Sequence, residues 1–367
     1  MNVALLGLGF VGRGVYDIIS NDFTDITVKY ILEKDDSKIK GLEALRASSI
    51  EDIINDDEIN VVIELIGGKT VAYDYVVKAL KHKKHVVTAN KALISEKFKE
   101  LTSLASKHNV SLLYEASVGG AIIVLDELKS IAKINKINKI EGIVNGSTNY
   151  ILSRVFLNSL SMEDAINEAF EQGYLETGST DDMDGLDALR KINILSMIAY
   201  DTYFQESDYH VVPLSNLSKE LIEYIKSKGY LIKYLVSSEL INDVMVGYVC
   251  ATVIDDSSVI SKINYEENII TVHGEYHKKQ SFIGQGAGRY PTASAVVYDL
   301  LTLNKQNQVK QNHEKVVKTD LTLKKYYFLV QTSKGIVKTD KQTFNDILCD
   351  QDVRCFVMIE EGLYEKI

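Results

Sequence analysis

Three glycines near the start of the chain are spaced as a phosphate-binding turn requires. Residues 7–12 read GLGFVG, a G-x-G-x-x-G pattern that follows an apolar run and opens a helical stretch. In that context the first glycine permits a tight turn, the second lets a pyrophosphate approach the backbone, and the third lets the helix pack on a sheet. Glu33 follows the next expected strand, where a carboxylate would bind the adenosine ribose hydroxyls. The pattern predicts a dinucleotide site; the alternative is a glycine turn that holds no ligand.

A carboxylate and a lysine stand four residues apart in a second segment. Asp187 and Lys191 fall within a helix that we expect over about residues 186–200, so both side chains lie on one face. A lysine can deliver or remove a proton when burial and its neighbours lower its pKa. A solvated ion pair at this spacing is the common alternative, and the spacing alone favours it.

The first 115 residues alternate short apolar runs with helical patterns, which is typical of a parallel sheet covered by helices. The run VVIELI at residues 61–66 is apolar without alternation, as a strand buried on both faces should be. Strands are expected near residues 3–6, 26–32, 61–66, 86–88 and 111–114.

The pattern changes after about residue 120. Residues 229–283 alternate more and are rich in Val, Ile, Tyr and Thr, which indicates antiparallel strands. The last 45 residues again resemble strands, and residues 326–330 and 355–359 could pair with each other. Helices are expected near residues 122–133, 150–158, 162–172, 186–200 and 293–301. The expected fold class is therefore α/β, with a parallel sheet first and a mixed second half.

Length and composition exclude several classes of protein. A chain of 367 residues suggests two to three domains, and 46% hydrophobic with 25% charged residues is ordinary for a globular protein. A net charge of −10 argues against a nucleic-acid binder. No apolar run approaches the roughly 20 residues of a membrane span, so no membrane partner is expected. Three scattered cysteines and the lack of a signal-peptide pattern favour a reducing compartment, and we expect the cytoplasm.

Seven segments in order resemble homoserine dehydrogenase along residues 1 to about 305. They are GLGFVG at 7–12, ELIGG at 64–68, VTANK at 87–91, YEASVGGA at 114–121, GIVNGSTNYIL at 142–152, GYLETGSTDDMDGLDALRK at 173–191 and GQGAGRYPTASAV at 284–296. The resemblance implies a Rossmann domain coupled to a mixed α/β catalytic domain with dimerising elements. It also implies hydride transfer between L-aspartate 4-semialdehyde and L-homoserine with NAD or NADP, in threonine and methionine biosynthesis.

The resemblance suggests a domain organisation. We expect a dinucleotide-binding domain over residues 1–120, a catalytic and dimerisation domain over residues 121–305, and a tail over residues 306–367. The last helix of the second domain, near residues 290–305, could pack back on the first. The tail is too short for a complete regulatory ACT unit, which makes feedback control through it doubtful. A homodimer or higher homo-oligomer is implied.

The resemblance also implies roles for individual side chains. Lys191 matches the proton donor and acceptor, and Asp187 matches a residue that binds the substrate and orders the site. Glu176 matches the carboxylate for the substrate amino group, and Asp182 a supporting acid. Lys91 ends a strand, where a cation could meet the cofactor or the substrate carboxylate.

Further positions match cofactor and cation sites. Residues 145–149 could either cap a helix or bind the substrate carboxylate. Glu33 favours NAD, whereas Lys34 could accommodate the 2′-phosphate of NADP. The expected cofactor-binding residues are Gly7, Gly9, Phe10, Val11, Gly12, Glu33, Lys91, Gly173, Gly286 and Gly288. A monovalent cation such as Na⁺ would be held, through a carboxylate and backbone oxygens, by Glu115, Val118, Gly120 and Ile122.

Two segments depart from the family pattern. Residues 177–179 read TGS where the family reads close to A-D-P, and Ala121 and Ile123 replace a glycine and a proline. These changes support an alternative function, a divergent nucleotide-binding paralogue that turns over poorly and acts as a sensor or partner protein.

Overall fold

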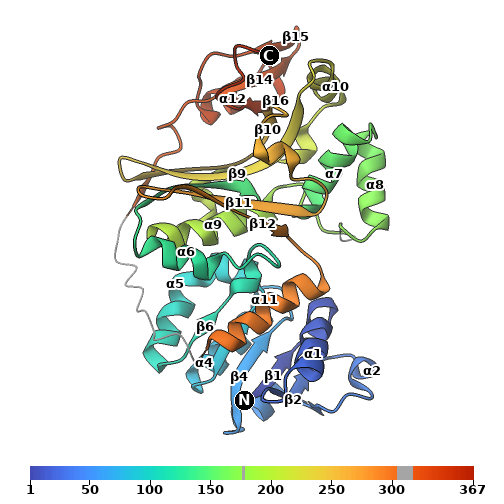
Figure 1. Cartoon of the computed structure of the whole chain (residues 1–367), viewed down its shortest axis with the longest axis vertical. Coiled ribbons are helices and arrows are strands. Elements are labelled where there is room, and N and C mark those ends of the chain that lie inside the picture. The colour runs from blue at the N-terminus through green and yellow to red at the C-terminus, as the bar shows by residue number, and fades with distance from the viewer. Residues whose placement is uncertain (176–177, 304–316) are drawn as a thin grey trace. The chain divides into compact units, whose positions relative to one another are not determined.

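The structure is a computed structural model that describes residues 1–175, 178–303 and 317–367 (Figure 1). These residues form two compact units. The first comprises Met1–Leu128 with a segment that begins at Ala287, and the second comprises Lys129–Gly286 with the carboxyl-terminal strands. The helix expected near residues 293–301 lies in the first unit, and the tail lies in the second.

The first unit is built on a six-stranded parallel sheet in the order β3-β2-β1-β4-β5-β6. This order is that of a dinucleotide-binding fold, in which ligands bind outside the carboxyl ends of the strands. It confirms the parallel sheet predicted from the alternating pattern. The strands are β1 (Asn2–Leu6), β2 (Thr27–Leu32), β3 (Leu45–Arg46), β4 (Ile59–Glu64), β5 (His85–Thr88) and β6 (Leu112–Leu113).

Helices cover this sheet and complete its core. Val3 and Leu5 of β1 and Ile63 of β4 are fully buried, and they share one apolar cluster with Ala293 and Val296 of α11. Asn90 begins α5 by accepting a hydrogen bond from the amide of Leu93 at 3.1 Å, which is a helix cap. The helices are α1 (Phe10–Asp22), α2 (Asp36–Ile39), α3 (Ile50–Ile54), α4 (Thr70–Lys81), α5 (Lys91–His108), the 3₁₀ turn η1 (Glu115–Ser117) and α11 (Arg289–Thr302). Helix α6 (Leu125–Ala132) begins in this unit and ends in the second.

The second unit is built on a ten-stranded mixed sheet. Its main path runs β12-β11-β7-β9-β10-β16-β14-β15, and β8 and β13 also pair with β10. Asn242 and Asp243 join β9 to β10 with positive φ angles of 52° and 61°, as a two-residue hairpin turn of type I′ requires. The strands are β7 (Ile137–Ile143), β8 (Tyr209–Val211), β9 (Leu231–Ile241), β10 (Val244–Ile254), β11 (Glu267–Gly274), β12 (Lys278–Gln285), β13 (Lys318–Thr319), β14 (Tyr327–Thr332), β15 (Gly335–Lys338) and β16 (Val353–Ile359).

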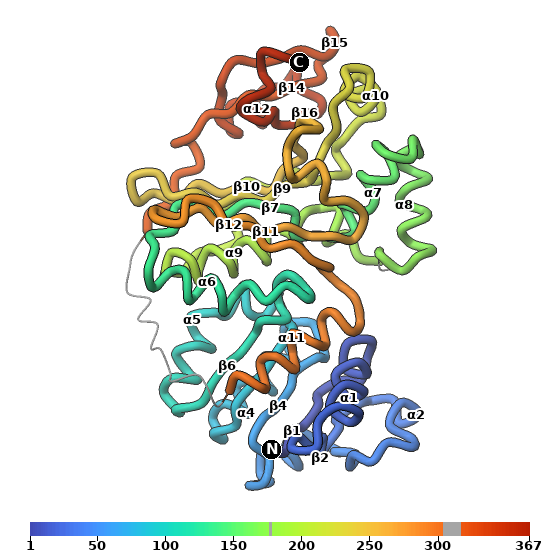
Figure 2. Tube along the Cα trace, viewed as in Figure 1, coloured from blue at the N-terminus to red at the C-terminus, as the bar shows by residue number. Residues whose placement is uncertain are grey.

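The tail belongs to this sheet (Figure 2). Strands β14 and β16 are antiparallel, with Tyr327 opposite Ile359, so the predicted pairing of the two segments is confirmed. The tail is not strand throughout, because α12 carries the buried side chains of Phe344 and Ile347 into an apolar cluster. The helices and 3₁₀ turns of this unit are α7 (Gly146–Leu157), α8 (Met162–Glu171), α9 (Leu186–Tyr200), η2 (Glu206–Asp208), η3 (Leu214–Asn216), α10 (Lys219–Ser227), η4 (Val259–Lys262) and α12 (Phe344–Cys349). Within the described ranges, no helix combines the length and apolar character that a membrane crossing needs.

Candidate active site

The glycine turn between β1 and α1 has the geometry that its sequence predicts. Gly7 has a φ of 94°, and a methyl group there would lie 2.9 Å from the carbonyl oxygen of Leu65. A methyl group on Gly12 would lie only 2.3 Å from the carbonyl oxygen of Gly7. Gly9 is the exception, because a methyl group there would meet nothing within 4 Å. Gly7 and Gly12 are thus required for packing. Gly9 leaves open space beside the amino end of α1, as an approaching pyrophosphate needs.

Phe10 and Val11 form the first turn of α1, and its preceding residue, Gly9, supplies no side-chain cap. Phe10 is 62% exposed, so its ring stands at the surface of this turn. The free amides of an uncapped first turn can bind an anion. The residues present therefore fit the phosphate-bearing part of a dinucleotide.

Glu33 is turned toward the glycine turn. Its carboxylate accepts the amide of Leu8 at 2.7 Å, and those of Lys34 at 2.9 Å and Asp35 at 3.2 Å. Burial alone would raise the pKa of Glu33, but these three amides and the nearby Lys38 outweigh it and hold the pKa below its usual value. Glu33 thus stays ionised and repels a second negative charge at the end of β2.

Glu64 lies at the same edge of the sheet and is not among the site residues that the sequence predicts. It ends β4 fully buried, and its carboxylate accepts the hydroxyl of Thr88 at 2.6 Å, the amide of Ile66 at 2.9 Å and the amide of Gly67 at 3.2 Å. Burial raises the pKa of Glu64, against the opposing effect of these hydrogen bonds. An acidic residue inside the apolar run VVIELI was the signal that could have found it.

The same network reaches the predicted lysine. Thr88 ends β5, and its hydroxyl also accepts the amide of Asn90 at 3.0 Å. The side chain of Asn90 donates to the carbonyl of Gly68 at 2.6 Å and caps the helix that Lys91 begins. Glu64, Thr88 and Asn90 therefore join the loop after β4 to the loop after β5, at the carboxyl edge of the sheet.

The predicted acid–base pair of the second unit is buried. Lys191 on α9 donates to a carboxylate oxygen of Asp187 at 2.8 Å and to the carbonyl oxygen of Val144 at 2.7 Å. Lys191 is 8% exposed and Asp187 is 5% exposed, so this is not the solvated pair that the spacing alone favours. Helix α9 starts after Gly185, where a methyl group would lie 2.3 Å from the hydroxyl oxygen of Tyr234. The ammonium group is thus fixed at the carboxyl end of β7.

Asn145 brings the second acid into the same cluster. Its amide nitrogen donates to Asp187 at 2.7 Å and to Asp182 at 2.6 Å. Its amide oxygen accepts the backbone N–H of Thr148 at 2.8 Å and thereby caps α7. One side chain therefore caps the helix and orders both carboxylates. The remaining acid, Glu176, lies outside the described residues.

The predicted cation loop is organised around Glu115. The carboxylate of Glu115 accepts the amides of Val124 at 2.6 Å, Leu125 at 2.7 Å and Asp126 at 3.0 Å, at the amino end of α6. These bonds fix one end of the loop that carries Val118, Gly120 and Ile122; Gly120 has a φ of 58°. Within the described residues no cluster of three or more His, Cys, Asp or Glu side chains could hold a metal. A cation held mainly by backbone oxygens remains a prediction.

The remaining predicted glycines have different surroundings. Gly173 follows α8 with a φ of 77°, as a glycine that ends a helix does. Gly288 precedes α11 with a φ of 125°. A methyl group on Gly286 would lie 2.0 Å from the amide nitrogen of Asn268, so Gly286 closes directly over that buried side chain. The side-chain amide group of Asn268 has no hydrogen-bond partner among the described residues.

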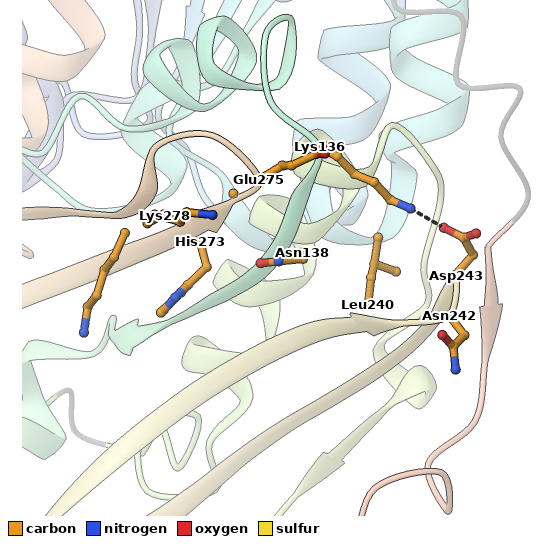
Figure 3. A pocket seen from close by; sticks show the side chains of 10 residues that line it. Lys136, Asn138, Leu240, Asn242, Asp243, His273, Glu275 and Lys278 are labelled. Atoms are coloured by element: carbon orange, nitrogen blue, oxygen red, sulfur yellow. Dashed lines mark hydrogen bonds and ion pairs between the residues drawn. The ribbon is translucent and has the colours of Figure 1, made fainter.

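A surface pocket of about 840 Å³ lies in the second unit, beside the β9–β10 turn and the β11–β12 turn (Figure 3). Lys136 points to Asp243 there and forms an ion pair at 3.0 Å. Lys278 and Glu275 contribute further charges of both signs, and His273 also lines the pocket. None of the predicted site residues that the structure describes lines this pocket.

Comparison with known proteins agrees with this architecture. Residues 7–115 match the family described as "Homoserine dehydrogenase, NAD binding domain", and residues 124–301 match that described as "Homoserine dehydrogenase". The homoserine dehydrogenase of Bacillus subtilis is 35% identical over 317 residues, covering 83% of this chain and 73% of the relative.

Solved structures agree as well. A homoserine dehydrogenase from Thiobacillus denitrificans superposes with a TM-score of 0.87 at 26% identity, covering 98% of each chain. One from S. aureus, solved at pH 7.5, superposes with a TM-score of 0.80 at 30% identity, covering 98% of this chain and 99% of the other. The glycine turn, the parallel sheet and the buried lysine are thus parts of a chain that belongs to the homoserine dehydrogenase family of oxidoreductases.

Proposed function

We propose that this chain is an active enzyme that interconverts L-homoserine and L-aspartate 4-semialdehyde, as a step of threonine and methionine biosynthesis. The observation that carries the proposal is the buried ammonium group of Lys191, fixed by Asp187 and the carbonyl of Val144. A residue that carries a proton must be held within hydrogen-bond reach of a reacting oxygen. The two acceptors fix the orientation of the Lys191 side chain.

In this proposal Lys191 donates and accepts the proton, and the cofactor would donate and accept the hydride. When homoserine is oxidised, its hydroxyl proton passes to Lys191, which accepts it as the neutral amine. The hydride leaves from the carbon that bears this hydroxyl group. In the reverse direction the ammonium group returns the proton to the aldehyde oxygen. The bound nicotinamide supplies the hydride acceptor or donor.

The surrounding acids would bind the rest of the substrate. Glu176 would bind the substrate amino group. Asp187, held by Asn145, would bind the substrate and order the site, and Asp182, held by the same side chain, would support it. Lys91, at the start of α5, would meet the cofactor or the substrate carboxylate. The ionised carboxylate of Glu33 favours NAD over NADP, because it repels a 2′-phosphate.

Three further properties are proposed from the resemblance. A homodimer or higher homo-oligomer is expected, and light scattering coupled to gel filtration will measure its mass. The loop that carries Glu115, Val118, Gly120 and Ile122 is expected to bind Na⁺ through backbone oxygens. A cytoplasmic location is expected.

The first test is an initial-rate assay with L-homoserine and either NAD or NADP. We expect Lys191→Ala to lower kcat by a factor of about 10² to 10⁴, as loss of a general acid–base group does. Lys233→Met is the matched control. Among the described residues of the second unit, Lys233 is the other buried lysine.

Near-wild-type turnover by Lys191→Ala would contradict the proposed mechanism. Tight binding of reduced cofactor without turnover by the wild-type chain would favour the alternative, a sensor or partner protein. The chain has no tryptophan, so fluorescence of the reduced cofactor reports binding with little energy transfer from the protein.

A further inference from the structure

Arg289 begins α11 beside the glycine turn of the first unit. Its guanidinium carbon lies 4.7 Å from the centre of the Phe10 ring and stacks over it as a cation–π pair. A methyl group on Gly14 would come within 2.8 Å of Cγ of Arg289 and 3.1 Å of Cβ of Ala293. Helix α11 therefore packs directly on α1, and this packing places the guanidinium group at the first turn of α1.

The charge of Arg289 is not neutralised by the described residues. No ion pair is formed by its guanidinium group there, and its Nε is buried without a hydrogen-bond partner. By contrast, Arg13 pairs with Asp17 at 2.8 Å, and Arg154 pairs with Glu168 at 2.7 Å. A buried guanidinium donor without an acceptor costs free energy, which an anionic ligand would restore.

Two helix ends add to the positive potential at this place. Helix α1 follows Gly9 and α11 follows Gly288, and neither glycine supplies a side-chain cap. Neither helix has an acidic residue in its first turn. The amides of α1, the open side of Gly9 and the guanidinium of Arg289 therefore surround one place that favours negative charge.

We propose that Arg289 binds the diphosphate of the dinucleotide cofactor, with the ring of Phe10 holding the plane of its guanidinium group. A guanidinium group matches phosphate oxygens through two parallel hydrogen bonds, and an aromatic platform limits the rotamers that it must give up on binding. The 2′-phosphate is the other phosphate that NADP offers. It would lie at the end of β2, beside the ionised Glu33, whereas Arg289 stands at the first turn of α1.

This inference rests on the proposed nicotinamide site, and its test reads binding and not turnover. The wild-type chain, Arg289→Gln and Arg289→Lys are each titrated with reduced cofactor, and binding is followed by the fluorescence of the cofactor. The bound cofactor is then displaced with ADP or with adenosine. We expect Arg289→Gln to weaken NADH and ADP about 10-fold, the loss of one charged hydrogen-bonding group, and to leave adenosine unchanged. Arg289→Lys should recover part of the loss, because it keeps the charge without the planar fork.

Arg13→Gln is the matched control, because Arg13 lies on α1, the helix of Phe10, with its charge already paired to Asp17. It should bind both ligands as the wild type does. Equal losses for ADP and adenosine in Arg289→Gln would mean a structural role and overturn the proposal. A loss confined to NADPH would assign the group to the 2′-phosphate and overturn it as well. A wild-type chain that binds these ligands but does not oxidise homoserine would contradict the proposed function alone.

Discussion

Two buried lysines of the second unit show how surroundings decide what a residue type does. Lys191 faces the carboxylate of Asp187 at 2.8 Å. Lys233 on β9 is 2% exposed, and its ammonium group donates to the side-chain oxygens of Asn149 at 3.1 Å and Asn264 at 2.9 Å, and to the carbonyl of Ile263. Burial lowers the pKa of Lys233 to about 7. Lys233 therefore joins three segments and carries its charge at a cost in stability.

This lowered pKa predicts a pH dependence of folding. The unfolded lysine holds its proton up to about pH 10.5, so between about pH 7 and 10.5 the unfolded state binds more protons than the folded state. Stability contributed by this site therefore rises with pH across that window, by at most about 1.4 kcal/mol per pH unit. Urea unfolding of the wild type and of Lys233→Met at pH 6.5, 8 and 9.5 measures it.

We expect the free energy of unfolding of the wild type to increase relative to that of Lys233→Met as the pH rises, because methionine does not titrate. A difference between the two chains that stayed constant from pH 6.5 to 9.5 would show that the pKa of Lys233 is not lowered in the folded protein.

At the scale of elements, the loops at the carboxyl edge of the first sheet are held by side chains and not only by backbone pairing. Thr88 gives its hydroxyl hydrogen to Glu64 and accepts the amide of Asn90. Thr88→Val keeps the shape but removes both bonds and leaves a buried carboxylate oxygen short of a donor. We expect a loss of about 1–3 kcal/mol in unfolding free energy, together with weaker binding of reduced cofactor.

Thr88→Ser should restore both properties because it keeps the hydroxyl. Asn60→Ala is the control at the opposite end of β4, where the side chain accepts the amide of Asn2 at 2.9 Å. It should leave cofactor binding unchanged. Unaltered stability and binding in Thr88→Val would show that the network holds neither loop.

Elements with strong periodicity or a motif could be predicted, and the short strand β6 (Leu112–Leu113) also lies within its expected range of 111–114. Helix α9 occupies Leu186–Tyr200, as its expected range of 186–200 states. Helix α10 (Lys219–Ser227) was not expected, although its buried residues Leu221, Ile222 and Ile225 have a helical spacing. Helix α12 (Phe344–Cys349) was not expected because six residues are too few to show a helical period, and its formation depends on the core that it covers. The same limit applies to the site. The sequence left residues 145–149 open between capping and binding, since only the fold brings Asn145 to Asp182 and Asp187.

At the scale of the whole molecule, the tail is a structural part of the second unit. Phe328 of β14 is fully buried and packs with Phe344 of α12, Phe356 of β16 and Tyr248 of β10. The segment that the sequence suggested as a partial regulatory domain thus completes the core around β10.

Removal of one ring from this cluster tests that role. We expect Phe328→Ala to destabilise the protein by about 3–5 kcal/mol, the usual cost of emptying a buried aromatic site. Val337→Ala is the control in the same tail, because Val337 is 49% exposed and its loss should cost at most about 0.5 kcal/mol. Thermal melts followed by circular dichroism compare the two; equal melting temperatures would mean that the tail does not contribute to the core.

The order of segments in each unit has a consequence for how the chain folds during its synthesis. The first unit takes α11 (Arg289–Thr302) into its core, and strand β10 of the second unit pairs with β13 and with β16, which ends at Ile359. A ribosome releases these late segments only after the early strands have emerged. The first unit can therefore close its core only after Thr302 has left the ribosome, and the second only after Ile359 has. Until then the first unit lacks the apolar side chains of α11 and strand β10 lacks its partner β16, and a chaperone would have to shield these surfaces.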